Sequence, residues 1–249
     1  MVTQLLTQTD AEIIYPESDG QPMADNTIQF RWITVIYYNL AWLFAKDPKV
    51  FIAGDLLWYP VKGNNQLRQA PDVMVVFGVD KGDRGSYQQW QENHIAPQVV
   101  FEILSPGNTP KEMNRKLLFY DRYGVEEYYL YDPYKNYLRG WLRIEGFLEE
   151  LEKLPQWVSP RLGIQFELSA DTLVLYRPGG QPFADYVEVQ QRYVEVQQQY
   201  VEVQQHLESA ENRASFAEKQ LEQERQRANR LEQLLREAGI DPNSNLNIS

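Results

Sequence analysis

The sequence predicts an α/β domain, in which a mixed sheet is flanked by helices, followed by a C-terminal coiled-coil helix. Two observations support this fold class. As far as about residue 180, apolar runs of strand length alternate with amphipathic stretches of helical length. Beyond the Pro- and Gly-rich segment 177–182, the chain continues as a seven-residue apolar repeat.

These changes of pattern divide the chain into four parts. Residues 1–24 are expected to form an extended N-terminal arm, because turn signals such as Asp19-Gly20 follow one another closely. Residues 25–180 form the α/β domain, and residues 184–238 form the coiled coil. Residues 239–249 are expected to be a flexible tail, since glycine and proline stop the helix there.

The composition excludes several kinds of site. The 249 residues include no cysteine and only two histidines, which rules out disulfides, thiolate zinc sites, a cysteine nucleophile and a histidine metal cluster. A general base would then be a carboxylate, a lysine or a metal-bound water. The net charge of −11 argues against tight non-specific DNA binding, although a local basic groove is compatible with it.

Signals for secretion or membrane insertion are not evident in the sequence. The N-terminus lacks the basic start and long apolar core of a signal peptide. The longest apolar run, residues 32–45, is too short to span a bilayer and contains Thr34 and Asn39. We therefore expect a cytoplasmic protein with no membrane partner.

A helix and a strand open the α/β domain. The helix can be capped by Asp25 or Asn26, and its apolar side continues to about Ala45. Residues 50–59 are expected to form one strand, with a possible bulge at Gly54-Asp55.

Two further strands and a long excursion come next. Residues 72–79 have the composition of a strand, and residues 98–104 form an apolar run of the length expected for a strand buried on both faces. Between them, residues 80–96 are polar and are expected to form a long hairpin excursion.

A well-signalled helix follows the second of these strands. Thr109 and Glu112 form a capping box around Pro110, and Gly124 ends the helix. Residues 125–132 return as an apolar strand. Four short strands should then form antiparallel hairpins that flank the core: Tyr137–Ile144, Phe147–Leu151, Ile164–Leu168 and Leu173–Tyr176.

Two charged residues stand where apolar residues are expected. Glu102 lies inside the buried run 98–104, which is costly unless something pairs with the carboxylate. Lys116 falls in the middle of the apolar face of the following helix, so it is aimed at the sheet that holds Glu102. The alternative is a local pair between Glu112 and Lys116, with the lysine stem lying along the apolar surface.

A third charged residue, Asp72, completes a candidate site. Asp72 begins one strand and Glu102 lies near the end of the next, so an antiparallel pairing would bring both carboxylates to one edge of the sheet. Two carboxylates suit a hard cation such as Mg²⁺, and Lys116 could orient water or stabilise charge on a phosphate. Asp72 alone could equally be a turn-capping aspartate after Pro71.

The motifs in this region resemble those of the Uma-two family of endonucleases, within the PD-(D/E)XK restriction-endonuclease-like superfamily. The resemblance covers roughly residues 10–180. It rests, in order, on Ala-Pro-Asp72, Phe-Glu102-Ile-Leu-Ser-Pro, Lys116 with Tyr120, and Gly-Val-Glu-Glu-Tyr-Tyr-Leu-Tyr-Asp-Pro ending at Pro133.

The resemblance implies a restriction-endonuclease-like mixed sheet and a metal-dependent nuclease site. The superfamily aspartate falls on Asp72, and the first acid of its second motif falls on Glu102. Leu104 stands where the parent pattern has a lysine, and Lys116 matches the lysine that family members place on the following helix. Asp55 is an auxiliary ligand or a turn residue.

Two hypotheses follow. In the first, the chain is a Mg²⁺- or Mn²⁺-dependent endonuclease that hydrolyses DNA, with Asp72 and Glu102 as metal ligands, Asp55 as a further ligand, and Lys116 as a catalytic residue. In the second, the domain is a catalytically inactive scaffold or binding module that oligomerises through its coiled coil. The order of the site residues favours the first, whereas Leu104 and the acidic charge favour the second.

The coiled coil is predicted from an exact repeat. The sequence Tyr-Val-Glu-Val-Gln-Gln occurs three times in residues 186–206, and apolar residues continue to recur at alternating spacings of three and four. The helix should end near Ala238 and be roughly 80 Å long. A helix of this kind implies a partner, most simply a second copy of the chain. The alternative is a single solvated helix.

Overall fold

The computed structural model describes residues 13–154 and 156–239. It divides into two compact units, Met1–Tyr186 and Val187–Ser249, and each is considered by itself below.

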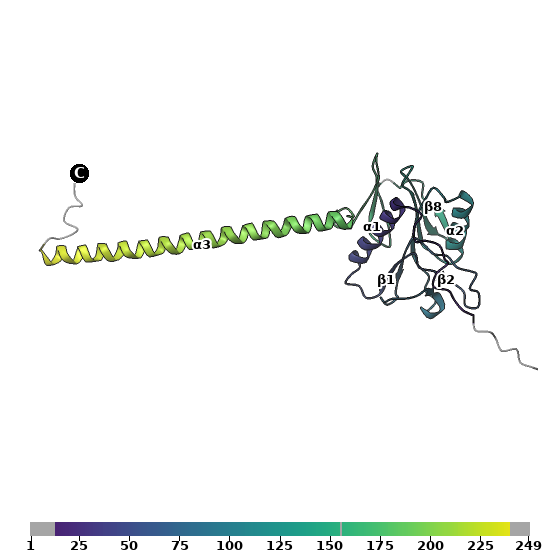
Figure 1. The fold of residues 1–249 in the computed structure, drawn as a ribbon, viewed down its shortest axis with the longest axis horizontal. Coiled ribbons are helices and arrows are strands. Elements are labelled where there is room, and N and C mark those ends of the chain that lie inside the picture. The colour runs from purple at the N-terminus through teal and green to yellow at the C-terminus, as the bar shows by residue number, and fades with distance from the viewer. Residues whose placement is uncertain (1–12, 155, 240–249) are drawn as a thin grey trace, which may run out of the picture. The chain divides into compact units, whose positions relative to one another are not determined.

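A six-stranded mixed sheet forms the centre of the first unit (Figure 1). The neighbouring strands β5 and β6 are parallel, and every other neighbouring pair is antiparallel. The predicted α/β fold with a mixed sheet is thereby confirmed. In spatial order the strands are β1 (Val50–Gly54), β3 (Val73–Phe77), β5 (Val99–Ile103), β6 (Glu127–Asp132), β7 (Tyr137–Ile144) and β8 (Phe147–Glu150).

One helix covers each face of this sheet (Figure 1). Side chains of a strand alternate between faces. Val73 and Val75 of β3 accordingly join the core beneath α1 (Thr27–Leu43), whereas Met74 and Val76 join the core beneath α2 (Pro110–Arg122). Because both faces are buried, the central strands read as continuous apolar runs in the sequence.

Both ends of α2 are fixed by specific contacts. At its start, Thr109 Oγ1 accepts a hydrogen bond from the amide of Glu112 at 3.2 Å, within the predicted capping box. At its end, the Arg143 guanidinium donates to the carbonyl oxygens of Asp121 at 2.6 Å and Val125 at 2.8 Å. The Asp121 carbonyl lies in the last turn of α2 and the Val125 carbonyl lies just beyond it, so Arg143 of β7 ties the end of the helix to the sheet.

The prediction of one continuous strand over residues 50–59 was wrong. β1 ends at Gly54, and Asp55 takes a left-handed conformation with φ of 49°. The chain then leaves the sheet, and β2 (Trp58–Tyr59) pairs in parallel with β4 (Tyr87–Gln88). The segment 80–96 therefore holds a short strand and the 3-10 helix η1 (Gln89–Gln91). Two strands of two residues each that pair across a long stretch of chain produce no local sequence pattern, so β2 and β4 were not predicted.

Among the described residues, five strands follow Asp132 instead of the four that were predicted, and they divide between two sheets; the additional strand is β9. β7 and β8 extend the central sheet. The others form a small antiparallel sheet that places Phe166 and Leu175 in the core beneath α1. This sheet has the order β11 (Leu173–Tyr176), β10 (Gln165–Leu168) and β9 (Trp157–Val158).

The described part of the N-terminal arm is held by aromatic residues. The Tyr15 ring contacts the rings of Tyr59 and Trp90, with centroids 5.2 Å and 4.8 Å away. The Tyr59 hydroxyl donates to the carbonyl oxygen of Pro16 at 2.7 Å. The first twelve residues of the predicted arm lie outside the described residues.

In its described part, the second unit consists of the helix α3 (Tyr186–Glu237), whose 52 residues begin with the last residue of the first unit. Gly239 follows it in a left-handed conformation, with φ of 75°. The predicted tail from residue 240 onward lies outside the described residues. Among the helices of residues 13–154 and 156–239, none is both long and apolar enough to cross a membrane.

A fully buried carboxylate, Glu127, joins the start of β6 to the loop before β10. It accepts hydrogen bonds from the hydroxyls of Tyr129 and Ser159 and from the amide of Arg161. Burial raises the pKa of Glu127 above its usual range, and the hydrogen bonds only partly offset this effect.

This raised pKa predicts a particular dependence of stability on pH. Ionisation of Glu127 costs more in the folded than in the unfolded chain, so its contribution to stability is lost as the pH rises through the pKa of the folded state. The free energy of unfolding of wild type minus that of Glu127→Gln should therefore fall as the pH rises from about 4, the usual pKa of a glutamate, toward neutrality. Urea unfolding of both proteins across this range measures the difference, and a difference that rises with pH would contradict the assignment.

Candidate active site

The register of two strands brings Asp72 and Glu102 together. Val73 of β3 pairs with Phe101 of β5 in an antiparallel ladder. The residue before Val73 and the residue after Phe101 therefore lie beside each other where this ladder ends. Both side chains share the α2 face of the sheet, because they alternate with residues of the α1-side core.

Glu102 is only 2% exposed, and both of its carboxylate oxygens have partners from α2. Lys116 Nζ donates to Oε2 at 2.8 Å, and the Tyr120 hydroxyl donates to Oε1. These charge-assisted contacts offset the cost of burying a carboxylate in the sheet. The alternative local pair of Lys116 with Glu112 does not form, because Glu112 instead turns back to the helix start.

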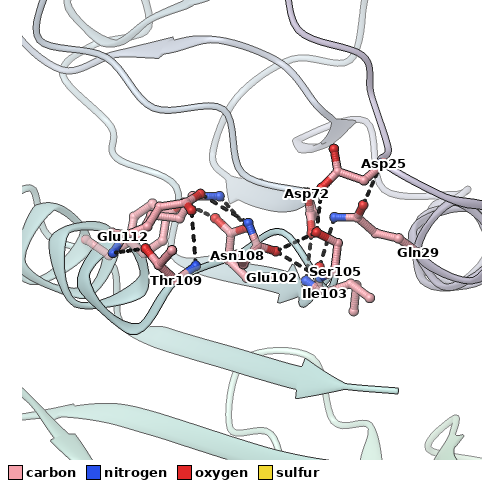
Figure 2. Close-up of polar contacts among 11 residues, drawn as sticks. Asp25, Gln29, Asp72, Glu102, Ile103, Ser105, Asn108, Thr109 and Glu112 are labelled. Carbon is pink, nitrogen blue, oxygen red and sulfur yellow. Dashed lines mark hydrogen bonds and ion pairs between the residues drawn. The ribbon is translucent and has the colours of Figure 1, made fainter. Parts of the chain in front are cut away.

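Asp72 is 8% exposed and is held by the backbone of β5. Its Oδ2 atom accepts a hydrogen bond of 2.6 Å from the amide of Ile103, one residue beyond Glu102 (Figure 2). The side chain thus continues the β3–β5 ladder by one hydrogen bond beyond the last paired residues. A turn cap would bond to the backbone close to Pro71 in the sequence, whereas this contact reaches a residue 31 positions away.

The three charges are electrostatically coupled. Burial and the neighbouring Glu102 carboxylate raise the pKa of Asp72 well above its usual range, although Lys116 and the Ile103 amide act in the opposite direction. For Lys116, burial works against the ammonium form, but the negative charges of Glu102 and Asp72 outweigh it and raise its pKa. Two buried acids with one base leave this edge of the sheet short of positive charge.

Asp55 lies nearby at the end of β1. Its amide donates to the carbonyl oxygens of Pro71 at 3.1 Å and Asp72 at 3.3 Å. These contacts hold Asp55 next to the residues that precede β3. Burial and the charge of Asp19 raise the pKa of Asp55, and the charges of Lys116 and Glu102 also reach it. In the part of the chain that the structure describes, acids and histidines form no preassembled metal cluster of three or more. The role of Asp55 as a ligand stays a prediction.

A polar network continues from this site on the α1 side (Figure 2). Gln29 Nε2 donates to the carbonyl oxygen of Ile103 at 2.9 Å, and Gln29 Oε1 accepts from the amide of Asp25 at 2.8 Å. The Ser105 hydroxyl contacts the Asp25 carboxylate, and the Ser105 amide donates to Asn108 Oδ1 at 2.8 Å. The network therefore joins the start of α1, the end of β5 and the start of α2.

Sequence reasoning missed Gln29 as part of this network. A signal was present in the sequence, because Gln29 precedes Ile33 and Ile36 at helical spacing. In the structure all three lie on the inward side of α1, and Gln29 is 6% exposed. It is a polar residue in an apolar stripe, as Lys116 is on α2. Its partner, a backbone carbonyl on β5, could not be identified from sequence.

The residues at this edge fit a hard divalent cation. Carboxylate oxygens are the ligands such cations prefer, and an oxygen that accepts one hydrogen bond keeps a lone pair for a metal. Burial and, after it, the Glu102 carboxylate raise the pKa of Asp72, and a cation beside it would favour the charged form. Leu104 packs against the α2-side core instead of supplying a charge, so Lys116 provides the lysine close to the pair.

A comparison with models of known protein families identifies the family of this chain. Residues 12–174 match the model of the family Uma2, described as "Putative restriction endonuclease". The chain belongs to the Uma2 family. A crystal structure of a "putative nuclease belonging to DUF820" from Anabaena variabilis ATCC 29413 aligns with 54% of this chain and 72% of its own, at 14% identity and a TM-score of 0.42. No curated protein matches the sequence.

The Tyr120 contact yields a prediction for stability. Tyr120→Phe removes the only group other than Lys116 that donates to Glu102 among the described residues, and leaves Glu102 Oε1 buried without a donor. The free energy of unfolding should fall by about 1–3 kcal/mol. Tyr123→Phe is the matched control, because it removes a hydroxyl next to the same helix without touching the carboxylates. Equal unfolding free energies of the two variants in urea would show that the Tyr120–Glu102 contact contributes nothing.

Proposed function

We propose that this Uma2-family chain is a Mg²⁺- or Mn²⁺-dependent endonuclease that hydrolyses phosphodiester bonds of DNA. One observation carries the proposal: Asp72 and Glu102 lie side by side at the edge of the sheet, and Lys116 reaches Glu102 of this pair from α2. Two acids that hold a cation, together with a lysine, suit this reaction, which needs neither histidine nor cysteine.

Each residue has a distinct part in the proposed reaction. Asp72 and Glu102 would hold the cation, and Asp55 would be a further ligand. The cation, when bound, would supply Lewis acidity toward the phosphate and a more acidic water. Lys116, anchored to Glu102, would orient the attacking water or stabilise the negative charge that develops on the phosphate. Tyr120 would keep the Glu102 carboxylate in one orientation.

A catalytically inactive nuclease-fold scaffold is the competing candidate. Two observations favour it: Leu104 occupies the usual position of the lysine, and the chain carries a net charge of −11, which repels DNA. In such a module the Lys116–Glu102 pair would be a structural ion pair, and the coiled coil would carry the function.

The proposal includes self-association through residues 184–238 and a cytoplasmic location. Support for self-association comes from α3, whose apolar repeat is exposed in the single chain. A protein with two or more copies of the site could cut both strands of a duplex.

Metal binding provides the first test. Wild type should bind Mn²⁺ in calorimetry, and Asp72→Asn and Glu102→Gln should each weaken binding by more than about tenfold, because each removes one ligand charge. Asp80→Asn is the matched control, since it removes an acid that is exposed and paired with Lys49 at the other end of β3. Circular dichroism checks that the variants fold.

The outcomes separate the two candidates. Absence of Mn²⁺ binding by wild type in the millimolar range would reject the endonuclease. If wild type binds Mn²⁺ through both acids but leaves plasmid DNA intact, the inactive module is favoured. Binding together with cleavage that both substitutions abolish supports the endonuclease.

A further inference from the structure

The surface of α3 contains an uncovered apolar seam. With Tyr186 as position a of a heptad lettered a to g, the a and d positions of the first three heptads are tyrosine and valine. These six side chains are between 46% and 74% exposed in the single chain: Tyr186, Val189, Tyr193, Val196, Tyr200 and Val203. Burying such a seam is the main driving force for helix pairing.

The two flanks of the seam carry opposite charges. Position g holds only bases among its charged residues: Arg192, Arg213 and Arg227. Position e holds the acids Glu211, Glu218 and Glu232, together with a single base, Arg225. Residues at e and g contact each other across a coiled coil, so these two rows determine which alignments of two helices are allowed.

The charges select a parallel arrangement. In parallel, in-register helices, each g residue faces the e residue five positions later in the other copy. Arg213 then faces Glu218 of the second copy, and Arg227 faces Glu232 of the second copy. In antiparallel helices g faces g and e faces e, which places arginine against arginine and glutamate against glutamate. The seam acid Glu224 is already paired within its own helix to Arg227, at 2.7 Å.

The register cannot come from the first three heptads. Because their repeat is exact, a slip of one heptad leaves the same tyrosines and valines facing each other. The slip is resisted by Arg225. In register, Arg225 faces Gln220 of the second copy, whereas a slip by one heptad in either direction brings it opposite Arg213 or Arg227. The in-register alignment is thus the one of these three that pairs no like charges.

We propose that α3 binds another copy of this chain as a parallel, in-register coiled coil in which Arg225 fixes the register. The inference rests on the self-association included in the proposed function and adds its geometry. Each α/β domain is joined to the N-terminal end of its own α3. Parallel pairing therefore attaches the active sites of both copies to the same end of the coiled coil, where they can act on one DNA duplex.

The orientation can be tested with a disulfide, because the chain has no cysteine of its own. In full-length Val196→Cys, the new thiols occupy a d position and meet only if the helices are parallel and in register. Mild oxidation should link nearly all chains into covalent dimers. The matched control is Gln198→Cys, at the outward f position, which should link far less. In a fully overlapping antiparallel pair, the d position 196 would pack near the a position 228 of the other copy, and no disulfide would form.

The same chemistry tests the register. A tagged Val189→Cys chain mixed with Val196→Cys can form the mixed disulfide only after a slip of one heptad, about 10.5 Å. We expect little mixed product with the native Arg225 and several-fold more when both chains also carry Arg225→Glu. Equal mixed product in both backgrounds would overturn the role of Arg225. A monomeric mass in light scattering would instead reject self-association itself, and neither result depends on metal or DNA.

Charge reversal provides an independent test of the parallel arrangement. Arg213→Glu and Glu218→Arg should each weaken self-association by about tenfold, because each converts symmetric attractive pairs into repulsive ones. The double variant Arg213→Glu/Glu218→Arg should recover most of the loss, since the pair is restored with its signs exchanged. Sedimentation equilibrium on the full chains measures this. A double variant that associates more weakly than either single variant would overturn the pairing.

Discussion

The structure depends on satisfying a carboxylate, Glu102, that is buried near the end of β5, an interior strand of its sheet. A charge in that position is tolerated only if both oxygens are bonded. Lys116 and Tyr120 meet this requirement from one helix, one turn apart. α2 therefore has to present one particular face to the sheet. The capping box at its start and Arg143 at its end hold it in that setting.

The last residue of β5 is held in a comparable way from two sides. Its amide donates to Asp72, which directly precedes the neighbouring strand β3, and its carbonyl accepts from Gln29 on α1. Ile103 thus connects β3, β5 and α1 through its backbone alone, while the preceding Glu102 connects β5 to α2. Catalytic side chains need supports of this kind, because small errors in their position are costly for a reaction.

Periodicity was sufficient to predict the parts of the site that depend on local structure. The position of Lys116 follows from helical spacing, and the neighbourhood of Asp72 and Glu102 follows from an antiparallel pair of strands. Contacts between distant segments were not accessible in this way. Gln29 reaches a backbone atom 74 residues away, and β2 pairs with β4 across a loop that has no strand-like pattern. The irregularity at Gly54-Asp55 was visible in the sequence, but it was interpreted as a bulge within one strand, whereas Asp55 takes a left-handed conformation after the strand has ended.

The exact repeat at the start of α3 also makes the length of this helix adjustable. Adding or removing one identical heptad would change its length by about 10.5 Å and turn the face that follows by only about 20°. Insertion of three or four residues would instead interrupt the seam. Duplication of a short stretch of coding sequence could thus lengthen α3 in fixed steps. Neither the α/β domain nor the charged heptads that follow the repeat would have to change.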